Sequence, residues 1–212
     1  MAGSALPPRD CELCPRLAAY RQVQRAAHPD WFNAPVPSFG DAGAALLIVG
    51  LAPGLGGANR TGRPFTGDFA GTLLYETLRK FGFAEGDYAA RADDGLVLRR
   101  ARIANAVRCV PPQNKPEPSE IKTCRQFLIS ELDAMPNVKV ILALGKIAHD
   151  SVLKTLDAKI SAHPFKHGAV YEIGRFKLVS SYHCSRYNTN TGVLTEKMVH
   201  DVVAKAKKAA GL

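Results

Sequence analysis

The chain has 212 residues, a length typical of one domain that buries about 70% of the surface of its unfolded chain. Hydrophobic residues make up 46% and charged residues 22%, which excludes an intrinsically disordered chain. No apolar run approaches the about 18 residues that cross a bilayer, and the charged N-terminal stretch does not read as a secretory signal. We therefore expect a cytoplasmic or nucleoid protein without membrane association, forming a single domain over residues 1–212. A monomer is expected, although the sequence says little about oligomeric state.

The charge balance favours an anionic partner. Lys and Arg number 28 against 19 Asp and Glu, which gives a formal net charge of +9. Nucleic acid is the commonest partner of a domain this basic, and a solvated basic surface is the alternative. The lysines at 205–208 are not assigned to binding, because cations stabilise the C-terminal end of a helix.

Apolar runs and helical periodicities alternate along the chain. In chain order, strands are predicted at residues 45–51, 102–108, 138–144 and 176–181, and helices at residues 72–81, 117–135, 146–156 and 195–210. Residues 29–43, 84–98 and 161–174 are predicted to be irregular. This alternation predicts the α/β class, as a three-layer α/β/α sandwich around a central four-stranded parallel sheet.

The cysteines predict a metal or cluster site. The chain has a C-x-x-C pair at Cys11 and Cys14, and separate cysteines at Cys109, Cys124 and Cys184. In a reducing compartment such spacing favours a metal over disulfides, and both zinc and a [4Fe–4S] cluster accept four thiolates. Such a site would tie the N-terminal arm, residues 1–44, to the proline-rich loop 110–118. Unrelated buried thiols are the alternative.

The glycine-rich segment 50–68 follows the first predicted strand. Its glycines allow a ligand to approach the backbone closely, although a purely structural turn is the alternative. No Gly-Lys-Ser/Thr follows, which excludes a P-loop, and Asn59 occupies the third position of a G-x-G-x-x-G pattern. A nucleotide cofactor is therefore not expected.

Three of the four predicted strands contain or lead into unusual residues. Ala52, Pro53 and Gly54 follow the first strand, Asn105 lies within the second, and His183 follows the fourth. Ligands of open α/β sheets bind beyond the carboxyl ends of the strands, so these stretches are expected to meet in one crevice. Taken singly, Asn105 also reads as a hydrogen-bonded core amide, and a histidine at a strand end is often structural.

Two segments together resemble a known family. Residues 50–68, G-L-A-P-G…N-R-T-G-R-P-F-T-G-D, resemble the first motif of the family 5 (b-type) uracil-DNA glycosylases. His-Cys-Ser-Arg-Tyr-Asn at 183–188, followed by T-G-x-L-T-E, resembles their second motif, and the segments between fit in order. The resemblance implies a [4Fe–4S] cluster on Cys11, Cys14, Cys109 and Cys124, with Cys184 left out.

The resemblance also implies an activity and a set of site residues. The activity is hydrolysis of the N-glycosidic bond of a deaminated base that has been flipped out of DNA. The residues expected to hold the base are Gly50, Ala52, Pro53, Gly54, Phe65, Asn105 and His183. The residues expected to take part in catalysis are Asp68, Asn105 and His183. The residues expected to contact DNA are Arg60, Arg63, Ser185, Arg186, Tyr187 and Asn188.

Ala52 stands where other families of the superfamily carry a polar or acidic side chain. Alanine cannot bind or activate water, so the resemblance shifts hydrolysis to Asp68, and the roomier pocket predicts tolerance of hypoxanthine and xanthine besides uracil. The alternatives are a non-enzymatic DNA-damage or single-strand binding protein on the same fold, a narrower family 4-like glycosylase, and an iron–sulfur redox protein.

Overall fold

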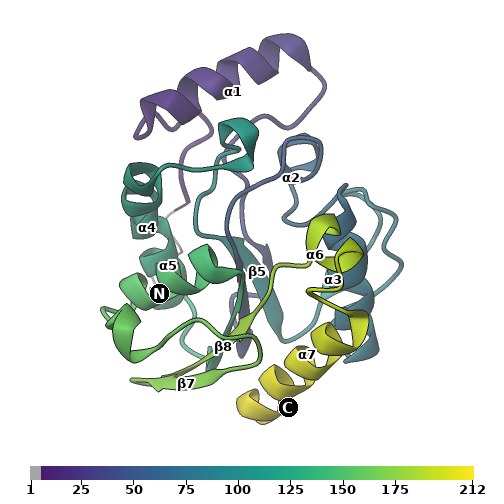
Figure 1. Ribbon diagram of the computed structural model, residues 1–212. Helices are drawn as coiled ribbons and strands as arrows, with labels where there is room; N and C mark the ends of the chain where they lie inside the picture. Colours follow the sequence, from purple (N-terminus) through teal and green to yellow (C-terminus); the bar gives the residue numbers. More distant parts are fainter. Residues whose placement is uncertain (1–5) are drawn as a thin grey trace.

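The computed structural model describes residues 6–212, in which strands and helices alternate (Figure 1). The strands are β1 (Phe39–Gly40), β2 (Leu46–Gly50), β3 (Ala84–Glu85), β4 (Val97–Leu98), β5 (Ala101–Asn105), β6 (Val140–Leu144), β7 (Val170–Ile173) and β8 (Phe176–Ser181). The helices are α1 (Pro15–Ala27), α2 (Ala58–Thr61), α3 (Phe69–Lys80), α4 (Pro118–Asp133), α5 (Lys146–Thr155), α6 (Arg186–Asn190) and α7 (Glu196–Ala210), with short 3-10 turns η1 (Pro112–Asn114) and η2 (Ile160–Ala162). No helix in this part of the chain is both long and apolar enough to cross a membrane.

The central sheet has six strands in the order β1-β5-β2-β6-β8-β7. The inner four, β5, β2, β6 and β8, are parallel and correspond to the four predicted strands, which confirms the α/β class. The predicted count of four strands was wrong, because β1 and β7 add antiparallel edges. β1 has only two residues, and β7 alternates exposed and half-buried side chains, so neither leaves a continuous apolar run in the sequence.

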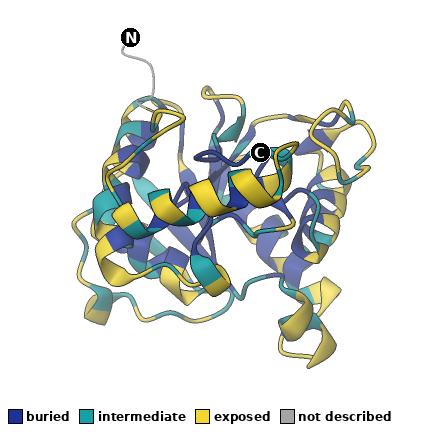
Figure 2. Ribbon diagram, turned by 90° about the horizontal axis from the view of Figure 1, so that it is seen from above, coloured by how far each residue is buried: buried dark blue, intermediate teal, exposed yellow. Residues whose placement is uncertain are grey.

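Both faces of the sheet are covered by helices, as Figure 1 shows, and the buried residues lie between the layers in Figure 2. Alternate residues of a strand point to opposite faces, so Leu46 and Ile48 pack toward α3 and α7, whereas Leu47 and Val49 pack toward α4 and α5. All these side chains are fully buried, as expected for parallel strands covered on both faces.

The N-terminal arm contains helix α1, which the sequence analysis did not predict. The buried face of α1 consists of Leu17, Arg21 and Gln24, at helical spacing. Two of these three residues are polar, so the hydrophobic periodicity that marks an amphipathic helix is missing from the sequence. The first five residues of the predicted arm and of the predicted domain lie outside the described residues.

A buried ion network ties β5 and the segment after it to α4. Glu131 on α4 is fully buried, and its carboxylate pairs with Arg108 at 2.9 Å and with Arg102. Ser38 donates to the same carboxylate at 2.6 Å. Burial opposes ionisation of Glu131, but Arg108, Ser38 and Arg102 together hold its pKa below the usual value. The network thereby fixes the segment that leads from Asn105 to Cys109.

Replacing Glu131 by Gln would leave two arginines without their anionic partner in a buried environment. We expect Glu131→Gln to lower the free energy of unfolding by about 3–5 kcal/mol at neutral pH. Because the folded pKa of Glu131 is lowered, its contribution is present above the unfolded pKa and is lost as the pH falls through the folded value, so the difference between wild type and variant should shrink in acid. Denaturant unfolding at several pH values measures this. Asp201→Asn, which removes an exposed pair with Lys197, is the control and should change little.

Candidate active site

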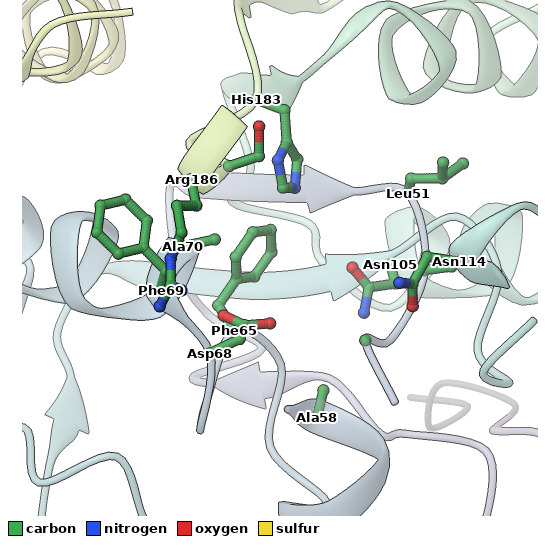
Figure 3. A pocket seen from close by; sticks show the side chains of 13 residues that line it. Leu51, Ala58, Phe65, Asp68, Phe69, Ala70, Asn105, Asn114, His183 and Arg186 are labelled. Carbon is green, nitrogen blue, oxygen red and sulfur yellow. The ribbon is translucent and has the colours of Figure 1, made fainter. Parts of the chain in front are cut away.

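A cavity of about 440 Å³ lies at the carboxyl ends of the parallel strands (Figure 3). It is lined by Leu51, Ala52, Gly54, Ala58, Phe65, Asp68, Phe69, Ala70, Asn105, Asn114, His183, Ser185 and Arg186. Leu51 directly follows β2, Asn105 ends β5, and His183 follows β8. The structure thus brings the three sequence-distant stretches that the sequence analysis singled out into one crevice.

Asn105 presents an unpaired acceptor at the wall of this cavity. The residue is 3% exposed, and its buried Oδ1 atom has no hydrogen-bond partner. A buried acceptor left unpaired costs about 1–3 kcal/mol, which a bound donor would recover. Gly50 is aligned with Asn105 in the parallel pairing of β2 and β5, and a Cβ atom there would lie 2.5 Å from Oδ1. Glycine at position 50 therefore leaves the space in which the amide sits.

Two rings line the cavity beside Asn105. The ring of Phe65 lies 5.9 Å from that of His183, tilted by 30°, and both face the cavity in Figure 3. Phe65 has a φ of +52°, a conformation that bulky residues rarely adopt. Burial lowers the pKa of His183, and the charge of Asp68 partly opposes this shift. The imidazole is therefore neutral at neutral pH and can donate one N–H.

Asp68 begins helix α3 and keeps one carboxylate oxygen on the cavity side. Oδ1 accepts a hydrogen bond from the N–H of Gly71 at 3.1 Å, as an N-cap does. A Cβ atom at Gly54 or Gly57 would lie only 3.2 or 2.6 Å from Oδ2. The two glycines therefore give the carboxylate the room to lie against the turn that follows β2.

The segment after β8 forms the mouth of the cavity. Ser185 caps the short helix α6, and Asn188 donates from its side chain to the carbonyl of His183 at 2.8 Å. These two side chains therefore stabilise the loop that carries His183. Arg186 lies over the ring of Phe69 at 5.4 Å, and Tyr187 is 74% exposed. Arg186 and Tyr187 are the exposed members of the segment 183–188.

Three predicted site residues occupy other positions. Arg63 was expected to contact phosphates, but its side chain is 4% exposed and forms a two-pronged pair with Asp94, both distances being 2.7 Å. That expectation was wrong, because the buried guanidinium is paired with Asp94 and does not reach the surface. Gly50 and Pro53 are buried and do not line the cavity, whereas Arg60 is exposed.

The sequence analysis gave no role to Asn114, Phe69 or Ala58, which also line the cavity. Asn114 lies in the proline-rich loop, where Gln113 and Asn114 have φ values of +54° and +57°. Two consecutive left-handed residues turn the loop back toward the sheet, a conformation that asparagine tolerates better than most residues. The polar run Gln-Asn-Lys between prolines is the sequence feature from which a role for Asn114 could have been predicted.

The four cysteines predicted to form a cluster lie together, at a second cavity that is separate from the crevice. Cys11, Cys14, Cys109 and Cys124 line one small cavity where the start of α1, the segment after β5 and helix α4 meet. No disulfide joins any of the cysteines, all of which lie in the described part of the chain. In the described part of the chain, no three His, Cys, Asp or Glu side chains are arranged to hold one metal ion. A [4Fe–4S] cluster does not require the thiols to converge on one ion, because each thiolate binds a different iron of the cluster.

The surroundings of the four thiols fit an anionic centre. Arg21 is 2% exposed, donates to the Cys109 sulfur at 3.6 Å and to the Cys11 carbonyl at 2.8 Å, and has an unpaired buried Nε. The backbone N–H of Arg108 donates to the Cys124 sulfur at 3.3 Å. Burial raises the pKa of Cys109 to about 12 and that of Cys124 to about 11. A bound cation would replace these protons, and Arg21 would then offset the thiolate charge.

Comparison with known proteins points to one family. Residues 37–207 match the Uracil DNA glycosylase superfamily. A type-5 uracil-DNA glycosylase of Thermus thermophilus is 46% identical over 209 residues, covering 95% of this chain and 94% of the relative. A type-5 uracil-DNA glycosylase of Pyrobaculum aerophilum is 39% identical over 206 residues, covering 95% and 90%. A type-4 uracil-DNA glycosylase of Archaeoglobus fulgidus is 32% identical over 154 residues, covering 70% and 69%.

The similarity to these type-5 proteins spans 95% of the chain. It therefore includes most of the N-terminal arm, residues 1–44, as well as the crevice. The match to the type-4 protein is lower in identity and covers less of the chain. The resemblance noted from the two motifs is thereby confirmed, and the narrower family 4-like alternative is not favoured. The chain belongs to the uracil-DNA glycosylase superfamily and, within it, to the type-5 enzymes.

Proposed function

We propose that this enzyme removes uracil from DNA by hydrolysing its N-glycosidic bond, and that the base occupies the cavity at the carboxyl ends of the strands. The observation that carries the proposal is the unpaired, buried Oδ1 of Asn105 beside the ring of Phe65. An amide offers a donor and an acceptor together, which matches the N3–H and O4 of uracil. The ring of Phe65 offers a surface for stacking the base.

The target base must leave the duplex before it can reach Asn105. Flipping costs a few kcal/mol and is least costly for a mismatched pair such as G·U. Arg186 and Tyr187, exposed at the cavity mouth, would enter the space that the base leaves, and Arg60 would contact a phosphate. Ser185 and Asn188 would hold the loop in place and contact DNA alongside it.

Bond cleavage leaves negative charge on the base and positive charge on the sugar. The neutral imidazole of His183 and backbone N–H groups of residues 50–54, other than Pro53, which has none, would donate to the base oxygen on which charge develops. Asp68 would position or deprotonate the attacking water, or stabilise the cationic sugar, as carboxylates do in glycoside hydrolysis. The hydrogen bond from the Gly71 N–H would hold this carboxylate at the start of α3.

We also propose that Cys11, Cys14, Cys109 and Cys124 hold a [4Fe–4S] cluster with a structural role. The four thiols line one cavity, and the buried cation Arg21 lies against them. Such a cluster would bind α1 to the proline-rich loop that carries Asn114. Cys184 is fully buried elsewhere, and burial raises its pKa to about 12.

Activity is tested with a uracil-containing duplex, using alkali to cleave the abasic sites that form. Wild type should release uracil, Asn105→Ala should lose at least about tenfold in rate, and Asp68→Asn should lose about 10²–10⁴-fold. Asparagine preserves the N-cap, so the loss reports the charge. Thr195→Ala, which removes the cap of α7, is the control for a lost cap and should remain active. Binding without base release by the wild type would contradict the proposal, and full activity of Asp68→Asn would reassign Asp68.

The small side chain of Ala52 at the cavity wall predicts a broad choice of base. We expect release of hypoxanthine and xanthine from matched duplexes, besides uracil. Ala52→Val should reduce release of these purines more than release of uracil, because it narrows the cavity without removing a polar group. Free bases are measured by chromatography, and uracil serves as the internal reference. Strict uracil specificity of the wild type would contradict the prediction.

The cluster predicts a coloured protein. Purified enzyme should be brown and contain about four iron and four sulfide ions per chain. Cys109→Ser should lose colour and iron, whereas Cys184→Ser should retain both. Metal analysis and visible absorption measure the outcome. A colourless preparation with stoichiometric zinc would favour the zinc alternative.

A further inference from the structure

We propose that the excursion between β3 and β4, residues 86–96, positions Phe65, with Tyr88 and Asp94 as the positioning residues. The inference rests on the proposed role of Phe65 in contacting the flipped base. None of the described residues of the excursion lines the cavity. Its buried polar groups instead converge on residues 63–67, which carry the Phe65 ring.

The backbone of Phe65 needs external support. Its φ of +52° is unfavourable for a residue with a large side chain. The ring also has little freedom, because a Cβ atom at Gly50 would lie 2.7 Å from its Cζ. The carbonyl of Phe65 lies against α3, where a Cβ atom at Gly71 would approach it to 1.8 Å. A small shift of this backbone would therefore change the space left for the base.

Two tyrosine hydroxyls hold the carbonyls at and before Phe65. Tyr88 donates to the Phe65 carbonyl at 3.2 Å, and the Gly67 N–H donates to the same hydroxyl at 3.3 Å. Tyr75 donates to the Pro64 carbonyl at 2.7 Å. The two tyrosine rings stack, with centroids 4.8 Å apart. Tyr88, on the excursion, thus bridges both neighbours of Thr66.

A buried ion pair fastens the excursion to the same loop. Besides its pair with Arg63, the carboxylate of Asp94 accepts the N–H groups of Ala89 and Leu96, each at 3.0 Å. The Arg63 hydrogen bond holds the pKa of Asp94 well below its usual range, so the pair stays charged. The Arg63 guanidinium lies 5.8 Å from the Tyr88 ring. Asp94 thereby fixes both the excursion and the residue two positions before Phe65.

The test is a double-mutant cycle that compares wild type, Tyr88→Phe, Phe65→Ala and the double variant. For each enzyme, the rate of uracil release in a single turnover is measured at increasing enzyme concentration, which gives a maximal rate and a half-saturating concentration. Phe65→Ala alone should lose about tenfold to a hundredfold, the range expected for one stacked base. Tyr88→Phe alone should raise the half-saturating concentration about threefold to tenfold, with a smaller effect on the maximal rate. In the Phe65→Ala background, Tyr88→Phe should change release by less than about twofold. Tyr171, on the edge strand β7, likewise donates to a carbonyl, that of Pro164, so Tyr171→Phe is the matched control and should behave as wild type.

Asp94→Asn provides a second route to the same answer, because it keeps the shape of the side chain but removes the charge that Arg63 binds. The loss of uracil release that Asp94→Asn causes in the wild-type background should likewise vanish in the Phe65→Ala background. Equal losses in both backgrounds, or a Tyr88→Phe enzyme as active as wild type, would overturn the positioning role while leaving uracil release by the wild type intact. Full activity of Phe65→Ala would overturn it too, by removing the role on which it rests. Absence of release by the wild type would instead overturn the proposed function.

Discussion

The parallel pairing of β2 with β5 is the constraint on which the site depends. This pairing aligns Gly50 with Asn105 at the carboxyl edge of the sheet, and the pairing of β6 with β8 brings His183 to the same edge. Backbone hydrogen bonds extend the β2–β5 alignment past the strands, from Ala106 to Gly50 and from Val107 to Leu51. A slip of one residue would turn Asn105 to the other face of the sheet and would separate it from Phe65.

The crevice combines polar groups with small residues that make room for them. Glycine at positions 50, 54 and 57 leaves space for the Asn105 amide and the Asp68 carboxylate. The same carboxylate caps α3, so one side chain both begins a helix and faces the cavity. Stability is supplied elsewhere, by the apolar layers on the two faces of the sheet and by the buried carboxylate of Glu131.

The sequence predicted the parts of the fold whose signal is local. The four parallel strands were predictable from continuous apolar runs, and α3 and α7 from apolar residues at helical spacing. The crevice was predictable because parallel strands place their carboxyl ends at one edge. Helix α1 was not, because its buried face contains Arg21 and Gln24. The internal role of Arg63 was not predictable either, because its partner Asp94 lies 31 residues away in a stretch that has little regular structure.

Ala52 has a second neighbour besides the crevice. It packs against the apolar group around Leu17, Val107 and Phe127 that encloses the four cysteines. Ala52 therefore lines the base cavity and also contacts the apolar group around the four cysteines. A longer side chain at this position would extend either into the base cavity or into the apolar group around the four cysteines. Changes in side-chain size at residue 52 therefore couple the width of the base cavity to the packing around the four cysteines.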